Sequence, residues 1–405
     1  MLIEQDKTFK WIMSSLMFLA IGFLASPTIV SVYHILVVIP MFIAIKRAES
    51  FHIPKSGWFL IALTVWGIVC NFVNLDELIK VRKSFDELKF YLLGPLLIYP
   101  LNYYFKRATP FQVKRMLNAL YFVITVAFIV GCTKALFSFD LLKMEFGDFK
   151  TRSDGLTNYM RYGYASAFLF ILGCGIVINK SHFKKVLNLK FFYLALSLCF
   201  FAVLAAKTRG ALLGIIVGCS FMMLKFKPRL GKALVGLGSI FIAIVIFISF
   251  TGIKTDSRFF NIKDGSNKKR MSQFYTAVKS IQEKPIFGLG ASQFSYHVTK
   301  LKNKYDIWSK EYSGHSHNIF LEHAANYGIP GLILFLGFLA FWGMELLKLG
   351  NFGWVILSYL VAFIAAGQVE NLFDNTNSHL LFFIYPLSFI KFGEISTFKN
   401  IETKT

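Results

Sequence analysis

The chain has 405 residues, of which 55% are hydrophobic and only 16% are charged, and its mean hydropathy is +0.56. Soluble domains contain about 45–50% apolar and about 25% charged residues, so this composition excludes a water-soluble fold and indicates a membrane protein. The 44 Lys and Arg residues outnumber the 22 Asp and Glu residues. Many of them lie in short stretches between apolar runs, so we assign them to orientation in the membrane and expect no nucleic-acid partner.

Residues 1–10 contain acidic and basic side chains ahead of a long apolar run, and no small-residue cleavage site follows. We therefore expect a retained first span rather than a removed signal peptide. The five cysteines all lie in apolar stretches without a Cys-x-x-Cys motif. They indicate buried thiols, and neither a disulfide framework nor a metal site.

Apolar runs long enough to cross a bilayer recur along the chain, and each must be helical because lipid offers no partner to backbone polar groups. The pattern predicts an all-α polytopic membrane protein with about 12 transmembrane helices. The expected spans are roughly 11–29, 32–46, 57–73, 89–104, 117–137, 161–179, 190–206, 210–225, 232–251, 327–347, 352–367 and 377–394.

The basic residues of the short connections predict the orientation of these spans. With the N-terminus inside, the cytoplasmic segments carry 21 Lys and Arg residues by our count, and the short connections on the other side carry 9. Because short cytoplasmic segments are enriched in Lys and Arg, we expect both termini to face the cytoplasm.

One polar connection, 252–326, is far longer than the usual connection of about 4–6 residues, and by the same topology it lies outside. We therefore divide the chain into spans 1–9 (1–251), this large external loop (252–326), and spans 10–12 with a cytoplasmic tail (327–405). Between Ser266 and Glu283 the loop predicts an amphipathic helix on or beside the membrane, with Ser266 as a candidate N-cap and Pro285 as its stop. Its apolar residues recur at helical spacing: Met271, Phe274, Tyr275, Val278 and Ile281.

Two basic motifs are candidates for binding phosphate. Lys207 and Arg209 lie in a turn of almost no length between two apolar runs. A charge this close to hydrocarbon is costly unless it meets a partner or a water-filled cavity, and Arg forks onto phosphate oxygens. The alternative is that both side chains extend to lipid headgroups. Arg270, preceded by Lys268 and Lys269, presents the same choice between lipid phosphates and a phosphate-bearing substrate.

The segment around His315, His317 and Asn318 is a candidate for acid–base chemistry. Histidine titrates near neutral pH and can take a proton from a hydroxyl, and Asn318 can orient a substrate or the ring. Either histidine could be the base. A metal site with Glu322 or His323 is an alternative, although no established metal-ligand spacing supports it, and so is a structural role at the start of a span.

Two weaker groups of polar residues lie next to expected spans. The first precedes the sixth span and comprises Arg152, Asp154, Gly155, Asn158 and Arg161. The second, near the last span, is Glu370 with Asp374. Charged groups at a membrane boundary are usually solvated surface, so we expect at most a supporting role for both.

His317-Asn318, followed after nine residues by Gly328-x-x-Gly331, resembles the His-Asn/Ser/Gln-x9-Gly-x-x-Gly signature of bacterial O-antigen ligases. The order of the other motifs is also similar to that family: an Arg-Gly turn, an Arg in a large periplasmic loop, and then Pro285-x-x-Gly288-x-Gly290. The stretch with Arg152 and Asn158 is a less specific likeness. Leu332 departs from the pattern, because many ligases have a small polar residue there. O-antigen polymerases and bacterial O-linked oligosaccharyltransferases share the signature.

The resemblance implies a GT-C-like glycosyltransferase of the bacterial inner membrane that is metal-independent, needs no cofactor and inverts the anomeric centre. Its donor would be O-antigen linked to undecaprenyl diphosphate, and its acceptor a sugar hydroxyl of lipid A-core at the periplasmic face. Arg209 and Arg270 would stabilise charge on the departing diphosphate, and His317 would take the acceptor proton. The expected supporting residues are His315, Asn318, Lys207, Arg152 and Asn158.

An O-antigen polymerase, a protein O-oligosaccharyltransferase and a non-catalytic transporter of lipid-linked glycan remain alternatives. A length of 405 residues suits a ligase or a polymerase better than the usually longer protein-modifying members. Twelve spans and a basic cavity would also suit a transporter, but no inverted repeat is visible and the polar residues concentrate in one external loop. The enzyme hypothesis requires Arg209, Arg270 and His317 to meet beside one membrane surface.

Overall fold

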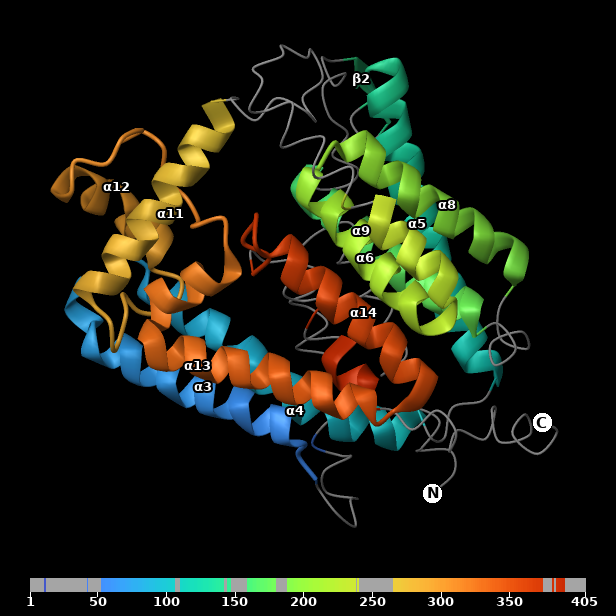
Figure 1. Ribbon diagram of the computed structural model, residues 1–405, viewed down its shortest axis with the longest axis horizontal. Coiled ribbons are helices and arrows are strands. Elements are labelled where there is room, and N and C mark those ends of the chain that lie inside the picture. Colours follow the sequence, from blue (N-terminus) through green and yellow to red (C-terminus); the bar gives the residue numbers. More distant parts are fainter. Residues whose placement is uncertain are drawn as a thin grey trace.

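The computed structural model describes residues 52–105, 110–141, 144–146, 159–179, 188–237, 265–373 and 384–389, with isolated positions at 11, 42, 239 and 381. These residues are almost entirely helical (Figure 1). The elements are α3 (Lys55–Val73), the 3-10 helix η1 (Leu75–Glu77), α4 (Val81–Phe105), α5 (Pro110–Phe137), β1 (Phe139–Asp140), β2 (Glu145–Phe146), α6 (Tyr159–Ile178), α8 (Leu189–Ala206), α9 (Arg209–Phe226), α11 (Gly265–Glu283), α12 (Phe294–Lys304), α13 (Ile319–Leu347) and α14 (Gly350–Ala366). The two strands form a short antiparallel pair.

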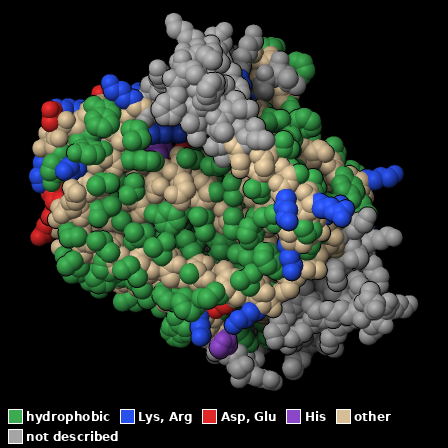
Figure 2. All heavy atoms as spheres, in the orientation of Figure 1, with side chains coloured by type: hydrophobic (Ala, Val, Ile, Leu, Met, Phe, Trp, Pro, Cys, Tyr) green, Lys and Arg blue, Asp and Glu red, His purple; other side chains and the backbone are tan. Residues whose placement is uncertain are grey.

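Five described helices are long and apolar enough to cross a membrane: α3, α6, α8, α9 and α13. Shorter apolar helical stretches are α14 and Tyr121–Lys134 within α5. The prediction of an all-α, multi-pass membrane protein is therefore confirmed. Figure 2 shows the broad apolar surface that these helices present.

Eight of the expected spans fall on described helices: 57–73, 89–104, 117–137, 161–179, 190–206, 210–225, 327–347 and 352–367. Apart from the isolated positions 11 and 42, the expected spans 11–29 and 32–46 lie outside the described residues, as do residues 240–251 of the expected span 232–251 and most of 377–394. The total of twelve and the sidedness of the termini therefore stay predictions.

Helix α13 begins earlier than its apolar pattern indicates. The helix starts at Ile319, whereas the sequence places the span from 327. Asn318 is the reason, because its side-chain oxygen caps the backbone amides of Phe320 and Leu321 at 2.9 and 3.0 Å. Residues 319–326, which the sequence assigns to the large loop, therefore form the first two turns of α13.

Helices α3 and α13 pack antiparallel along their length. Ser56 at the start of α3 bonds Glu345 at the end of α13, and Phe59 stacks on Phe341 with ring centroids 4.9 Å apart. Further along, Trp66 Nε1 donates to the carbonyl of Tyr327 at 2.8 Å. The start of α13 therefore lies at the same end of the bundle as the end of α3.

Small residues bring α9 and α14 close together. A Cβ added at Gly214 would lie 3.5 Å from the Ala362 carbonyl, and one at Gly218 would lie 2.8 Å from the Ala362 side chain. Such small-residue contacts let membrane helices approach closely. The backbone amide of Ile319 donates to the carbonyl of Gly367 at 2.8 Å, so the end of α14 meets the start of α13.

At Gly328 of the signature, the backbone of α13 contacts the loop segment 285–290. Gly328 interrupts the helix with φ +70, which exposes backbone groups to neighbouring chain. The Ile329 amide then donates to the Pro285 carbonyl at 2.8 Å, and the amide of Gly290 donates to the Asn326 carbonyl at 3.0 Å. A Cβ at Gly328 would lie 1.9 Å from the carbonyl oxygen of Ile286, so glycine is required there.

The expected loop helix is present as α11, and it ends at Glu283, ahead of Pro285. Because α11 begins at Gly265, Ser266 lies inside the helix, and the prediction that Ser266 is its N-cap is wrong. The fully buried residues of α11 are mostly small and polar, although Ile281 packs on the apolar cluster that α11 shares with α12 and α13. The buried residues are Ser272, Gln273, Thr276, Ala277 and Ser280, whereas Met271, Tyr275 and Val278 are exposed.

Candidate active site

His317 immediately precedes the cap of α13 and has a left-handed backbone with φ +56. Few non-glycine residues adopt this conformation, and they concentrate at functional sites. Asn318 continues the segment by capping the helix, and its side-chain amide donates to Gln368 at 3.3 Å. Asn318 therefore ties the start of α13 to the turn after α14.

That turn supplies a carboxylate to the histidine. Nδ1 of His317 lies 2.9 Å from Oε1 of Glu370, so we assign the ring proton to Nδ1 as the donor. The other ring nitrogen, Nε2, is then an acceptor, and the Tyr312 hydroxyl lies 3.1 Å from it. The two rings are parallel within 5°. A carboxylate that fixes the tautomer and leaves Nε2 facing a hydroxyl is the arrangement of a general base.

The same carboxylate pairs with Arg270. Nη2 of Arg270 lies 3.6 Å from Oε2 of Glu370, which is an ion pair without a hydrogen bond. Within the described part of the chain, Nε of Arg270 is buried and has no hydrogen-bond partner. The guanidinium thus retains donors for a further anion.

Glu370 is nine-tenths buried, and its ionisation depends on these neighbours. Burial by itself raises a carboxyl pKa, but the hydrogen bond and charge of His317, the Arg270 guanidinium and the Asn371 amide together hold the pKa of Glu370 below its usual value. The Asn371 amide donates to Oε1 at 3.2 Å. Glu370 is therefore an ionised link between the histidine and the arginine.

Tyr312 is held against the histidine by cationic neighbours. Nζ of the buried Lys302 donates to the Tyr312 carbonyl at 2.7 Å, and Nζ of Lys269 lies 5.4 Å from the Tyr312 ring. Burial and then the charge of Glu370 raise the pKa of Tyr312, so its hydroxyl stays protonated at neutral pH.

Arg209 is the first residue of α9, at the same end of the bundle. Its neighbour Gly210 approaches the 367–370 turn, because a Cβ added there would lie 3.0 Å from the side chain of Val369. Lys207 is exposed and ends α8 in a left-handed conformation with φ +49. The structure thus joins Arg270 and His317 through Glu370 and puts Arg209 on an adjacent helix end. Arg152 and Asn158 lie outside the described residues.

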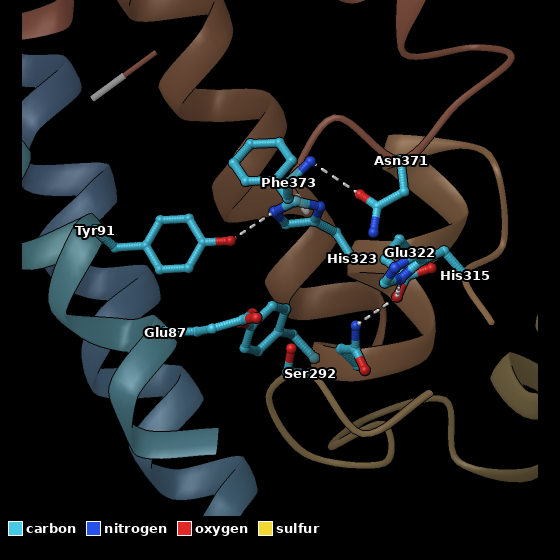
Figure 3. Close-up of a pocket in the computed structure, with 10 residues that line it drawn as sticks. Glu87, Tyr91, Ser292, His315, Glu322, His323, Asn371 and Phe373 are labelled. Atoms are coloured by element: carbon cyan, nitrogen blue, oxygen red, sulfur yellow. Dashed lines mark hydrogen bonds and ion pairs between the residues drawn. The ribbon is translucent and has the colours of Figure 1, made fainter. Parts of the chain in front are cut away.

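His315 faces a different, polar cavity (Figure 3). Its Nδ1 lies 3.7 Å from Oε1 of Glu322, whose other oxygen accepts from the Ser316 amide at 2.7 Å. Glu87 points into this cavity from α4. A volume of about 20 Å³ suits a water molecule and not a sugar ring. The lining residues are Glu87, Tyr91, Ser292, His315, Glu322, His323, Asn326, Tyr327, Asn371 and Phe373.

Both ring nitrogens of His323 are engaged beside that cavity. Nε2 lies 2.9 Å from the Tyr91 hydroxyl, and Nδ1 lies 2.7 Å from the Ile319 carbonyl. Among the described residues, no group of three or more His, Cys, Asp or Glu side chains is arranged to hold a metal ion.

Sequence reasoning undervalued two residues of the site. The sequence indicates at most a supporting role for Glu370, although an acidic residue three positions after the expected span 352–367 is visible in it. No sequence spacing indicates that Tyr312 belongs to the site, because its contact with His317 depends on how the chain between them turns. The structure also gives the two histidines different environments: Nδ1 of His317 lies 2.9 Å from Glu370, whereas Nδ1 of His315 lies 3.7 Å from Glu322 beside the polar cavity.

Residues 194–336 match the family model described as O-antigen ligase. The matched segment contains Arg209, Arg270 and His317 but ends before Glu370. A comparison with curated proteins gave no match.

Proposed function

The chain carries an O-antigen ligase family region at residues 194–336, and from this premise we propose that it transfers O-antigen polysaccharide from undecaprenyl diphosphate to a lipid A-core sugar hydroxyl. The family supports an activity of the ligase or polymerase type, and the choice of lipid A-core as acceptor is our proposal. The reaction would occur at the periplasmic face of the inner membrane.

The observation that carries this proposal is the linked set of His317, Glu370 and Arg270. A histidine oriented by a carboxylate can accept a proton, and an arginine that forms an ion pair with the same carboxylate can hold an anion. Proton acceptance and anion binding are the two tasks that transfer from a sugar diphosphate to a hydroxyl requires.

In the proposed reaction the acceptor hydroxyl gives its proton to Nε2 of His317 as its oxygen attacks the anomeric carbon. The new C–O glycosidic bond forms while the bond from that carbon to the diphosphate breaks, and the diphosphate leaves with the electron pair. The proton on Nδ1 remains hydrogen-bonded to Glu370, which stabilises the imidazolium. Attack opposite the leaving group inverts the anomeric centre.

Arg270 and Arg209 would stabilise the charge that develops on the departing diphosphate. Arg270 suits this role because its Nε has no partner among the described residues, and a preorganised guanidinium needs little rearrangement as charge builds. Arg209 would approach from the start of α9. This division assigns no step to a metal ion.

Tyr312 indicates where the acceptor hydroxyl would bind. Its own hydroxyl lies 3.1 Å from Nε2 of His317, within the range over which a base takes a proton. We propose that the acceptor hydroxyl displaces the tyrosine hydroxyl from this nitrogen. Both substrates have lipid tails, so a site at the helix ends suits their meeting at a membrane surface.

Purified protein tests the proposal directly. The assay contains lipid-linked donor, lipid A-core acceptor and a chelator, and we expect transfer by the native chain but not by His317→Gln. His52→Gln is the matched control, because His52 is exposed ahead of α3 at the opposite end of the bundle. Full transfer by a folded His317→Gln protein would exclude the assigned base.

A deletion strain separates ligase from polymerase. A ligase deletion removes polymer from the core and leaves lipid-linked polymer to accumulate. A core that carries a single repeat would instead indicate the polymerase, and unchanged lipopolysaccharide would contradict both assignments.

A further inference from the structure

One side of α11 is apolar and exposed, and within the described residues neither the proposed transfer reaction nor packing against other helices accounts for it. Met271, Tyr275 and Val278 are 56%, 44% and 38% exposed, and together we term them the α11 stripe. The opposite side of the helix, formed by small and polar residues, packs on α13 and α12. A helix normally buries its apolar side, so the reversed burial of α11 indicates a surface that faces something other than water.

Aromatic and basic groups flank the α11 stripe. Trp308 is 42% exposed, stacks on Tyr275 with ring centroids 6.0 Å apart, and donates its Nε1 hydrogen to the Lys268 carbonyl at 3.0 Å. Nζ of Lys279 lies 5.6 Å from the centre of the Tyr275 ring. Tryptophan and tyrosine favour the headgroup level of a bilayer, and lysine at the edge of an apolar face favours anionic lipid.

The position of α11 against the membrane-spanning helix α13 also fits a membrane surface. The helix packs on α13, which is long and apolar enough to span, and Leu321 in the first turn of α13 belongs to the apolar cluster that they share. Figure 2 shows apolar side chains over the α11 region that continue into the apolar surface of the helices below. The α11 stripe therefore lies where the lipid-facing surface meets the outer end of the bundle.

We propose that the α11 stripe and Trp308 dock on the surface of the adjoining leaflet and select anionic phospholipid. The apolar side chains enter the boundary between headgroups and acyl chains, and Lys268 and Lys279 meet lipid phosphates. Positive charge beside an apolar face complements an anionic bilayer, which is why lipid is a better occupant than a second copy of this basic chain.

Docking of α11 on the leaflet would also hold Arg270 in position. Arg270 directly precedes Met271 on α11, so a helix held on the leaflet keeps the arginine at a constant depth. The inference concerns lipid contact and is independent of whether the proposed transfer reaction is correct.

Spin-label accessibility in proteoliposomes tests the docking without any assay of transfer. The five natural cysteines are replaced by serine or alanine, and a nitroxide is attached at Val278→Cys in the full-length protein. Ile333→Cys in α13 is the lipid-facing reference, and Lys300→Cys in α12 is the water-facing reference, since both positions are exposed. Collision with oxygen and with a water-soluble nickel chelate is measured in phosphatidylcholine vesicles with and without phosphatidylglycerol.

We expect the ratio of oxygen to nickel collisions at 278 to approach that at 333, and to rise further when phosphatidylglycerol is present. The Lys268→Glu, Lys279→Glu double variant should lose the response to phosphatidylglycerol while the label at 333 is unchanged. A ratio at 278 equal to that at 300 in both vesicle types would overturn the proposal. Loss of both collisions with spin–spin broadening would also overturn it, since that result indicates a second copy of the chain.

Discussion

Glu370 lies 2.9 Å from Nδ1 of His317 although 53 positions separate the two residues in sequence. The contact exists because the end of α14 meets the start of α13, where the Ile319 amide bonds the Gly367 carbonyl. It gives the histidine a defined tautomer, and through Glu370 it also connects the histidine to Arg270. The relationship predicts how substitutions of Glu370, Arg270 and Tyr312 change the proposed transfer.

Replacing Glu370 with glutamine should reduce transfer by about 10²–10⁴-fold, the range that a positioned acid–base group contributes. Glutamine retains the shape of the side chain but cannot stabilise the imidazolium that forms on His317. Initial transfer rates measure the effect, with Glu311→Gln as the control, since Glu311 is an exposed carboxylate in the neighbouring loop. Equal rates for the two variants would remove Glu370 from the mechanism.

Acid should destabilise the native protein through Glu370. The pKa of Glu370 is lowered in the folded protein, so its contribution to stability is complete above the usual glutamate pKa of about 4.3 and is lost as the pH falls through the folded value. Melting temperature measured in detergent should therefore fall more steeply with acid in the native chain than in Glu370→Gln. If the melting temperatures of the two proteins fell equally with acid, ionised Glu370 would not contribute the expected stability.

Substituting Arg270 with glutamine should slow transfer by about 10²–10³-fold, as expected when one donor to a developing anion is removed. Arg270→Lys should recover part of the rate, because it restores charge but not the fork of donors. Lys300→Gln is the control, because Lys300 is an exposed basic residue of the neighbouring helix α12 with no assigned role in the site. A normal rate in a folded Arg270→Gln protein would show that the diphosphate binds elsewhere.

Tyr312→Phe should change the transfer rate by less than about tenfold, which corresponds to a single hydrogen bond. The prediction follows from the proposal that the acceptor hydroxyl displaces the tyrosine hydroxyl from His317. The readout is the rate at saturating acceptor, compared with His317→Gln. If Tyr312→Phe were as inactive as His317→Gln, the phenol would take part in proton transfer and our acceptor position would be wrong.

Gly328→Ala should destabilise the protein by at least about 1–3 kcal/mol, the usual cost of a strained backbone. The substituted residue would keep φ +70, and its Cβ would meet the carbonyl of Ile286 at 1.9 Å. Gly343→Ala in the same helix is the control, because its nearest neighbour would lie at 3.7 Å. Similar melting temperatures for the two variants would show that position 328 does not require glycine.

Much of the helical framework was predictable because hydropathy is a local property. A run of apolar residues must be helical in lipid whatever its neighbours are, and eight expected spans accordingly fall on described helices. The start of α13 was missed because its first two turns are held by the Asn318 cap and by packing on α11, and not by hydropathy. The candidate residues Arg209, Arg270 and His317 were also visible by type and order, although their roles remain proposals.

The sequence by itself determined that this is an all-α membrane protein with a helix in its long polar loop and a candidate histidine ahead of a later span. Only the tertiary structure decided that Glu370 orients His317, that His315 faces a separate cavity and that α11 exposes its apolar side. The physical reason is that apolar content selects helix and membrane residue by residue. Which side chains meet, and which face of a helix is covered, depends instead on the packing of helices distant in the chain.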